Sequence, residues 1–175
     1  TQFINYINKE HNTSIDNYLK LHSWSTTNID LFWSSVSDFF KIKYSSKANC
    51  VFRLSDQMHK TKWFDGARLN YAENILESKD SSKNAIEFFN ELGDSKSITY
   101  SQLYSKVSVV ASLLKEKGIR SGDRVAAMMP NIPETVISSL ASASLGAVWS
   151  SCSPDFGGKA ILDRFKQIKP KVLIV

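Results

Sequence analysis

The sequence predicts an α/β fold: a partial doubly wound parallel sheet with helices on both faces, preceded by a helical and irregular N-terminal extension. Three short apolar runs, at residues 124–129, 147–151 and 171–175, are typical of central strands. Segments with helical spacing separate these runs, and a strand–helix–strand order implies parallel strands joined by right-handed crossovers. The composition suits a folded domain, because 42% of the residues are hydrophobic and 22% are charged.

The N-terminal extension is predicted to cover residues 1–80. Its clearest element is a helix over residues 28–40, which Thr27 or Asn28 can cap. Apolar residues recur on one face of this helix, and we interpret that stripe as core and not as a ligand site. The stripe consists of Ile29, Phe32, Trp33, Val36, Phe39 and Phe40. Later in the extension, Asn70 can cap a second, short helix.

The α/β domain is predicted to span residues 81–175 and to follow a polar loop at residues 77–84. A strand at residues 85–89 opens it. Thr99 and Gln102 then form a capping box, in which each side chain satisfies a free backbone N–H of the first helical turn. The helix that follows is expected to end at Gly118. It should bury Leu103, Val107, Val110 and Leu114.

Proline and glycine mark the limits of the remaining two helices. Pro133 suits a first helical turn, because the N–H that it lacks would have no partner there. Gly146 ends that helix. Gly157 or Gly158 precedes the last helix, which stops before Pro170.

Ligands of doubly wound sheets bind beyond the carboxyl ends of the strands, here residues 129–131 and 150–157. The sequence has no Gly-x-x-x-x-Gly-Lys-Ser/Thr loop, no Gly-x-Gly-x-x-Gly and no Gly-x-Ser-x-Gly elbow. Cys152 is interpreted as a small packed residue, because no histidine is its neighbour in the sequence. No spacing predicts a metal site, and no catalytic residue is assigned. The residues by themselves therefore leave the ligand open.

The net charge is modestly positive, with 22 Lys and Arg against 17 Asp and Glu. Residues 159–175 hold most of the local excess, which could meet phosphates or face water. A pI of about 9.1 and the aromatic residues keep a nucleic-acid-binding or protein-interaction module as an alternative. Two distant cysteines, no signal-peptide pattern and no apolar run of membrane length predict a cytoplasmic protein without a membrane span.

Several short runs, weak one by one, together resemble the AMP-forming acyl-CoA synthetases in order and spacing. They lie at residues 98–103, 122–125, 130–134 and 144–148. Two longer runs are similar to the acetoacetyl-CoA synthetase branch of that family. They are Gly-Ala-Arg-Leu-Asn-Tyr-Ala-Glu-Asn at 66–74 and Trp-Ser-Ser-Cys-Ser-Pro-Asp-Phe-Gly at 149–157. The resemblance covers the chain from about residue 28 onward, where the predicted helix is similar to the N-terminal extension of acetyl-CoA synthetases.

The resemblance implies a two-step ligase of lipid and ketone-body metabolism. Acetoacetate would attack the α-phosphate of ATP to give an acyl-adenylate and pyrophosphate, and the thiol of CoA would then displace AMP. Mg²⁺ and lysines would stabilise the phosphate charges. A short-chain acyl-CoA synthetase acting on acetate, propionate or butyrate is the alternative within the family. The oligomeric state is left open.

The resemblance also implies a CoA-side segment, formed by Ser153, Pro154, Asp155 and Phe156. Relatives of the acetyl-CoA type have two glycines before the phenylalanine, where this chain has Pro154 and Asp155. The family's phosphate loop, adenine motif, hinge and catalytic lysine have no counterpart here and would lie beyond Val175. We therefore expect the chain to be the N-terminal part of the enzyme, and to be inactive and poorly soluble alone.

Overall fold

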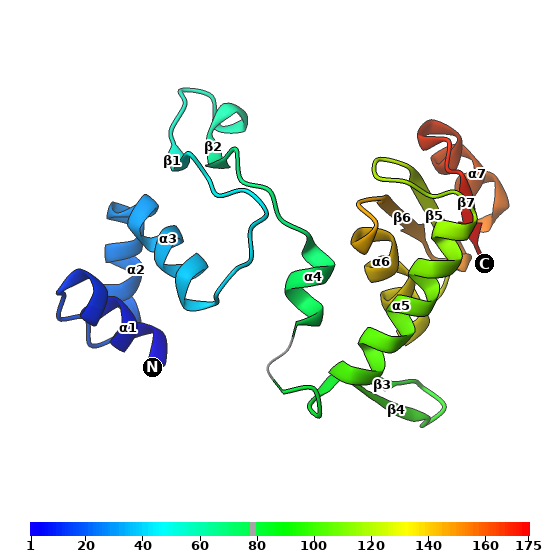
Figure 1. Ribbon diagram of the computed structural model, residues 1–175, viewed down its shortest axis with the longest axis horizontal. Coiled ribbons are helices and arrows are strands. Elements are labelled where there is room, and N and C mark those ends of the chain that lie inside the picture. The colour runs from blue at the N-terminus through cyan, green and yellow to red at the C-terminus, as the bar shows by residue number, and fades with distance from the viewer. Residues whose placement is uncertain (78–79) are drawn as a thin grey trace. The chain divides into compact units, whose positions relative to one another are not determined.

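The computed structural model describes residues 1–77 and 80–175, and the chain divides into two compact units. The N-terminal unit is Thr1–Leu69 and the C-terminal unit is Asn70–Val175 (Figure 1). Of the polar loop predicted at 77–84, residues 78 and 79 lie outside the described residues. The domain boundary predicted after residue 80 stays a prediction.

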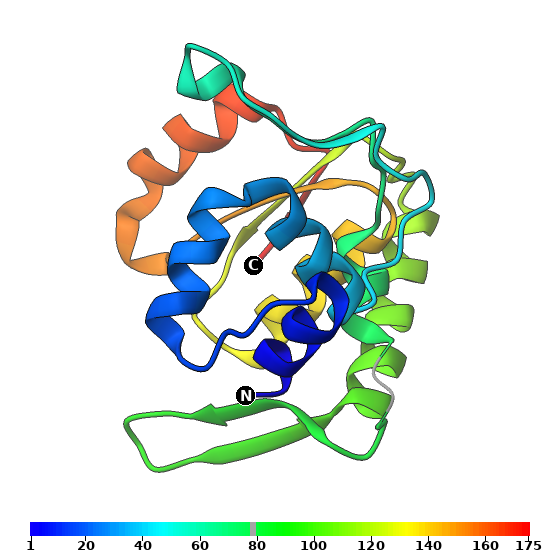
Figure 2. The ribbon, with the colours of Figure 1, turned by 90° about the vertical axis from the view of Figure 1, so that its left-hand side faces the viewer.

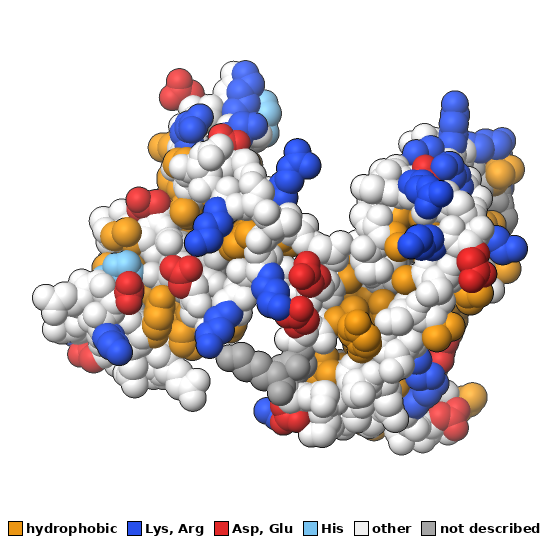
Figure 3. All heavy atoms as spheres, viewed as in Figure 1, with side chains coloured by type: hydrophobic (Ala, Val, Ile, Leu, Met, Phe, Trp, Pro, Cys, Tyr) orange, Lys and Arg blue, Asp and Glu red, His pale blue; other side chains and the backbone are white. Residues whose placement is uncertain are grey.

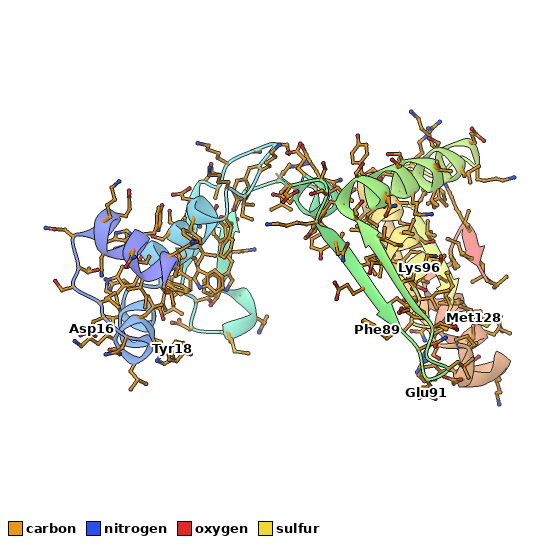
Figure 4. The ribbon with its side chains drawn as sticks, turned by 90° about the horizontal axis from the view of Figure 1, so that it is seen from below. Asp16, Tyr18, Phe89, Glu91, Lys96 and Met128 are labelled. Atoms are coloured by element: carbon orange, nitrogen blue, oxygen red, sulfur yellow. The ribbon has the colours of Figure 1, made fainter. Side chains whose placement is uncertain are left out.

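Three helices form most of the N-terminal unit: α1 (Gln2–His11), α2 (Tyr18–Thr27) and α3 (Ile29–Phe39). Thr1 caps α1 by accepting a hydrogen bond from the N–H of Ile4, and Asn17 caps α2 in the same way. Asp16 and Tyr18, at the start of α2, are labelled in Figure 4. The small core of this unit consists of Ile4, Ile7 and Ile15, with Phe3, Tyr6, Leu21 and Trp24 packed against it.

Helix α3 confirms the predicted helix, but the predicted cap was wrong: Thr27 ends α2, and Asn28 makes no capping side-chain hydrogen bond. The stripe interpreted as core is only partly buried. Phe40 is 65% exposed and Trp33 is 40% exposed, whereas the buried residues of α3 are Ser35 and Ser37. Several of these rings pack edge to face with one another or with Phe3. Phe3, for example, lies 5.1 Å from Phe39 between ring centroids.

A two-stranded antiparallel sheet completes the N-terminal unit. Strand β1 (Cys50–Arg53) pairs with β2 (Lys62–Asp65), and the 3-10 turn η1 (Met58–Lys60) lies between them. Gly66 follows β2 with φ = 83°, a left-handed conformation that favours glycine.

The C-terminal unit begins with α4 (Tyr71–Leu76) and an antiparallel hairpin of β3 (Asn84–Phe89) and β4 (Ser95–Thr99). Figure 4 labels Phe89 and Glu91 toward the turn of this hairpin. The Asn70 cap is confirmed, because its side chain accepts from the N–H of Glu73 at 3.2 Å.

The predicted capping box opens α5 (Tyr100–Glu116). The Thr99 hydroxyl accepts from the N–H of Gln102 at 3.3 Å, and the Gln102 side chain accepts from the N–H of Thr99 at 3.0 Å. Leu103, Val107 and Leu114 of this helix are buried. The three expected core residues therefore share one face, while Val110, the fourth, is half-buried.

The parallel sheet contains the three predicted strands, in the order β6-β5-β7. They are β5 (Arg124–Met128), β6 (Val148–Cys152) and β7 (Val172–Ile174), and β5 pairs in parallel with both neighbours. Helix α6 (Pro133–Ser144) joins β5 to β6. The 3-10 turn η2 (Pro154–Phe156) and helix α7 (Gly157–Ile168) join β6 to β7. Pro133 occupies the first turn of α6, as predicted.

Adjacent residues of β5 face opposite sides of this sheet, as the two-residue period of a strand requires. Val125 belongs to the larger core, with α5 and α6, whereas Ala126 packs with Ile161 and Phe165 of α7. Figure 2 shows α5 and α7 on opposite sides of the strands. Helices cover both faces, and the doubly wound prediction is confirmed.

Candidate functional site

The carboxyl ends of β5 and β6 lie side by side, and the chain leaves them toward opposite faces of the sheet. Met128 is in register with Cys152, and the N–H of Met129 donates to the carbonyl of Cys152 at 3.3 Å. Helix α6 then packs on one face and α7 on the other. This is a topological switch point, the place where open α/β sheets bind ligands.

The loop after β5 is closed by short hydrogen bonds to Pro130. Its carbonyl accepts from the Thr135 hydroxyl at 2.7 Å and from the N–H of Ile132 at 2.9 Å. Glu134, in the first turn of α6, forms an ion pair of 3.0 Å with Lys96 of β4. The hydrogen bond from Lys96 lowers the pKa of Glu134. This carboxylate is therefore ionised at neutral pH, and the ammonium group of Lys96 balances its charge.

The loop after β6 contains all four residues predicted for the CoA side. The Ser153 hydroxyl donates to Asp155 Oδ2 at 2.6 Å and accepts from the N–H of Asp155 at 3.4 Å. Pro154 occupies the first position of η2, where its fixed φ is favourable. Ser153 and Asp155 therefore satisfy each other and close the turn, while residues 154–157 are exposed.

Gly157 and Phe156 connect this turn to α7. Gly157 has φ = 69° and ψ = 150°, and an added Cβ there would meet no atom within 4 Å. Backbone conformation and not space therefore requires glycine at this position. Phe156 is 49% exposed, and the guanidinium carbon of Arg164 lies 4.1 Å from its ring centroid.

Cys152 is buried among Ala126, Ile161 and Phe165, which confirms its interpretation as a packed residue. All three histidines belong to the N-terminal unit, and the ring of His11 forms a hydrogen bond of 2.6 Å with Ser35. The C-terminal unit thus has no histidine to activate a serine or cysteine nucleophile. Within residues 1–77 and 80–175, no group of three or more His, Cys, Asp or Glu side chains could hold a metal ion.

The basic residues of the last segment divide into two groups. Lys171 pairs with Asp123 at 2.7 Å, and Arg164 stacks on Phe156. The other cations, Lys159, Lys166 and Lys169, are exposed. Figure 3 shows blue side chains gathered where α7 and β7 lie. The question raised by the sequence, whether these cations meet phosphates or face water, therefore concerns only the second group.

A cavity of about 590 Å³ in the C-terminal unit lies between α5, α6 and β7. Met129 is among its lining residues, but residues 153–157 are not. A second cavity of about 310 Å³ is lined by Trp149 of β6, together with residues of α4, α5 and α6. The loop after β6 is thus an open surface and not the wall of either cavity.

Sequence reasoning missed two contacts at this edge: Lys96 with Glu134, and Arg164 with Phe156. The first joins residues 38 positions apart in the chain. The second joins a residue of η2 to a residue of α7 that lies about two helical turns further on. The sequence places Glu134 next to Pro133 at the expected start of α6, but no local pattern identifies Lys96 as its partner.

Comparisons with known proteins agree with this architecture. The family model of AMP-binding enzymes matches residues 76–175, and the model of the acetyl-coenzyme A synthetase N-terminus matches residues 18–75. Among the described residues, no helix is both long enough and apolar enough to cross a membrane.

Several individual proteins are similar over nearly the whole chain. The acetoacetyl-coenzyme A synthetase of Rhizobium meliloti (strain 1021) is 42% identical over 99% of the chain and 26% of its own length. The acetoacetyl-CoA synthetase of Xenopus tropicalis is 39% identical with the same coverage. The solved acetoacetyl-CoA synthetase from Streptomyces lividans matches with a TM-score of 0.88 at 36% identity, over 98% of this chain and 27% of that one. The chain thus spans about a quarter of the length of these relatives.

Proposed function

We propose that the protein, which belongs to the family of AMP-binding enzymes, is an AMP-forming ligase that joins acetoacetate to CoA. The observation that carries the proposal is the match to the Streptomyces lividans acetoacetyl-CoA synthetase, which includes both units of the chain. The switch point at the carboxyl ends of β5 and β6 supports it further, because a doubly wound sheet binds its ligands at that position.

The proposed reaction has two steps. A carboxylate oxygen of acetoacetate attacks the α-phosphorus of ATP, the bond from that phosphorus to the bridging oxygen breaks, and pyrophosphate leaves. The sulfur of CoA then attacks the acyl carbon, AMP leaves with the bonding electrons, and the thiol proton is released. Activation is needed because a free carboxylate has no good leaving group, and the adenylate supplies one.

ATP and CoA are the proposed cosubstrates, with Mg²⁺ as the counter-ion of the nucleotide phosphates. The described residues contain no cluster of ligands for a metal ion. We therefore derive no step through Mg²⁺ from this part of the chain. Two free cysteines, one half-buried and one buried, support the further proposal of a cytoplasmic location.

The loop after β6 is the proposed contact with CoA. Its turn is closed by Ser153 and Asp155, so it offers a preformed surface instead of a flexible glycine pair. We propose that CoA meets the exposed turn and the ring of Phe156, while Ser153 and Asp155 hold the shape of the turn. No catalytic residue is assigned within these 175 residues.

The test is an activity assay on the product of the complete reading frame. We expect acetoacetate-dependent pyrophosphate release with ATP, and acetoacetyl-CoA formation when CoA is added. Turnover with propionate or butyrate but not with acetoacetate would replace the proposal with a short-chain acyl-CoA synthetase. No turnover with any acid, together with strongly salt-dependent binding to DNA or RNA, would favour a nucleic-acid-binding module.

A further inference from the structure

We infer that Arg164 is a positioning residue for the thioester-forming step, acting through its contact with Phe156. This inference rests on the proposed function, in which the turn after β6 meets CoA. The guanidinium carbon of Arg164 lies 4.1 Å from the centroid of the Phe156 ring, within the range of a cation–π contact.

The need for such a contact follows from the position of Phe156. The ring is 49% exposed and stands at the end of η2, just before Gly157 changes the direction of the backbone. The Ser153 hydroxyl bonds to Asp155, and the Ser153 carbonyl accepts from the N–H of Phe156 at 3.3 Å. These bonds order the backbone of the turn but do not hold the ring of Phe156. The stacked guanidinium of Arg164 is therefore the contact that restrains the exposed side of this ring.

Helix α7 gives Arg164 a rigid base. Ile161 and Phe165, which flank it in the sequence, are buried against β5 and β6 and fix the rotation of the helix. Arg164 is thus held where its planar group can cover the ring. Lys166 belongs to the same helix but lies about 200° further around its axis, since an α-helix has 3.6 residues per turn.

The test is a double-mutant cycle in the complete enzyme with Arg164→Gln and Phe156→Leu, and with Lys166→Gln as the matched control. We expect Arg164→Gln to raise the KM for CoA about two- to five-fold, the effect of losing one exposed cation–π contact. Acetoacetate-dependent exchange between ATP and pyrophosphate, which needs no CoA, should not change. Arg164→Gln should have no further effect on the KM for CoA once Phe156 is leucine.

Conservative variants separate positioning from direct charge recognition. Arg164→Lys keeps the charge but loses the planar stack, so we expect an intermediate KM for CoA. Phe156→Tyr keeps the ring and should behave as the unaltered enzyme. If the effects of Arg164→Gln and Phe156→Leu on the KM for CoA were strictly additive, Arg164 would act by charge alone and the inference would be wrong.

Hydrogen–deuterium exchange tests the ordering without relying on activity. The amides of residues 155–158 should exchange faster in Arg164→Gln than in the unaltered protein or in Lys166→Gln. Unchanged exchange would overturn the positioning role even in an active enzyme. Faster exchange in a protein that activates no acid would uphold the contact but refute the proposed function and, with it, the role in thioester formation.

Discussion

The C-terminal unit buries apolar residues on both faces of one parallel sheet, whereas the N-terminal unit joins short elements through rings and side-chain hydrogen bonds. The helices of the C-terminal unit are positioned by a periodic stripe of apolar residues, as in α5. The helices of the N-terminal unit bury few apolar residues, Ile4 and Ile7 of α1, and depend also on individual contacts, such as that of His11 with Ser35. Periodic spacing therefore predicts which residues are buried in the layered core of α5 better than in the small helical unit that contains α3.

The largest effect should come from shortening one fully buried isoleucine in each unit. Ile119 is 1% exposed in the C-terminal unit and Ile7 is 0% exposed in the N-terminal unit. Ile119→Ala and Ile7→Ala should each lower the free energy of unfolding by about 2–5 kcal/mol, from lost burial and the cavity left behind. Hydrogen exchange resolved by peptide would show which unit loses protection.

Each loss should be confined to the unit that carries the substitution. Because each unit is compact by itself, we expect Ile7→Ala to leave hydrogen exchange in α5 and β5 unchanged. Equal loss of protection throughout the chain would contradict the comparison, because the two units would then unfold as one cooperative body.

The second effect concerns two asparagines that each make three hydrogen bonds. The side chain of Asn8, in α1, bonds to Thr13 and Ile15 of the loop that follows the helix. The side chain of Asn70 caps α4 and also donates to the carbonyls of Ala143 and Ser144 at the end of α6. Replacing either with alanine should cost about 2 kcal/mol of unfolding free energy, measured by chemical denaturation.

Asn70→Asp separates the two roles of Asn70. It keeps the oxygen that caps α4 but replaces the donor to α6 with a charge next to helix C-terminal carbonyls, which is unfavourable. We expect a loss close to that of Asn70→Ala. Stability unchanged by Asn70→Asp would mean that the contact with α6 contributes little.

A smaller effect is expected for the hydrogen bond between His11 and Ser35, in which His11 Nε2 lies 2.6 Å from Ser35 Oγ. Ser35 is 3% exposed, so His11→Phe would leave its hydroxyl buried without this partner and should cost about 1–2 kcal/mol. Adding Ser35→Ala should recover part of that loss. Thermal denaturation of the single and double variants would measure the recovery. No recovery would indicate that packing, and not the hydrogen bond, is responsible for the loss.

The smallest effect is a pH dependence at Asp123. The hydrogen bond from Lys171 and the N–H of Arg120 hold the pKa of Asp123 below its usual value of 3.8. The folded state therefore binds this proton less readily than the unfolded state does. The stabilisation is complete above pH 3.8 and is lost as the pH falls through the lower folded pKa.

Lys171→Met tests this assignment. It should raise the pKa of Asp123 toward 3.8, as followed by the chemical shift of its carboxyl carbon during acid titration. Lys169→Met, a change at a neighbouring cation of the same segment, serves as the control. An unshifted Asp123 in Lys171→Met would assign the low pKa to the backbone hydrogen bond instead.

Local features were predictable where neighbours in the sequence make the contact. The Asn70 cap, the Thr99–Gln102 box and the proline at the start of α6 all involve partners within a few residues. The stripe of α3 was not predictable in the same way. Its spacing is helical, but whether a ring is covered depends on how much chain lies over it, which the spacing does not state.

The candidate site was predictable as a location, because residues that follow parallel strands must meet at one edge of the sheet. Its contacts were not. Ser153 with Asp155 is local and could have been proposed from an ST-type turn. Arg164 over Phe156 required the direction of α7 relative to η2, which the sequence leaves open.

By itself the sequence determined that three apolar runs become parallel strands, since the helices between them allow only crossover connections. It also determined where α4 and α5 begin, because the caps of Asn70 and Thr99 are local hydrogen bonds. Only the tertiary structure decided that β5 lies in the middle of the sheet, that α7 covers the face opposite α6, and that Lys96 meets Glu134. Those choices depend on contacts between distant segments, whose energies appear only once the layers pack together.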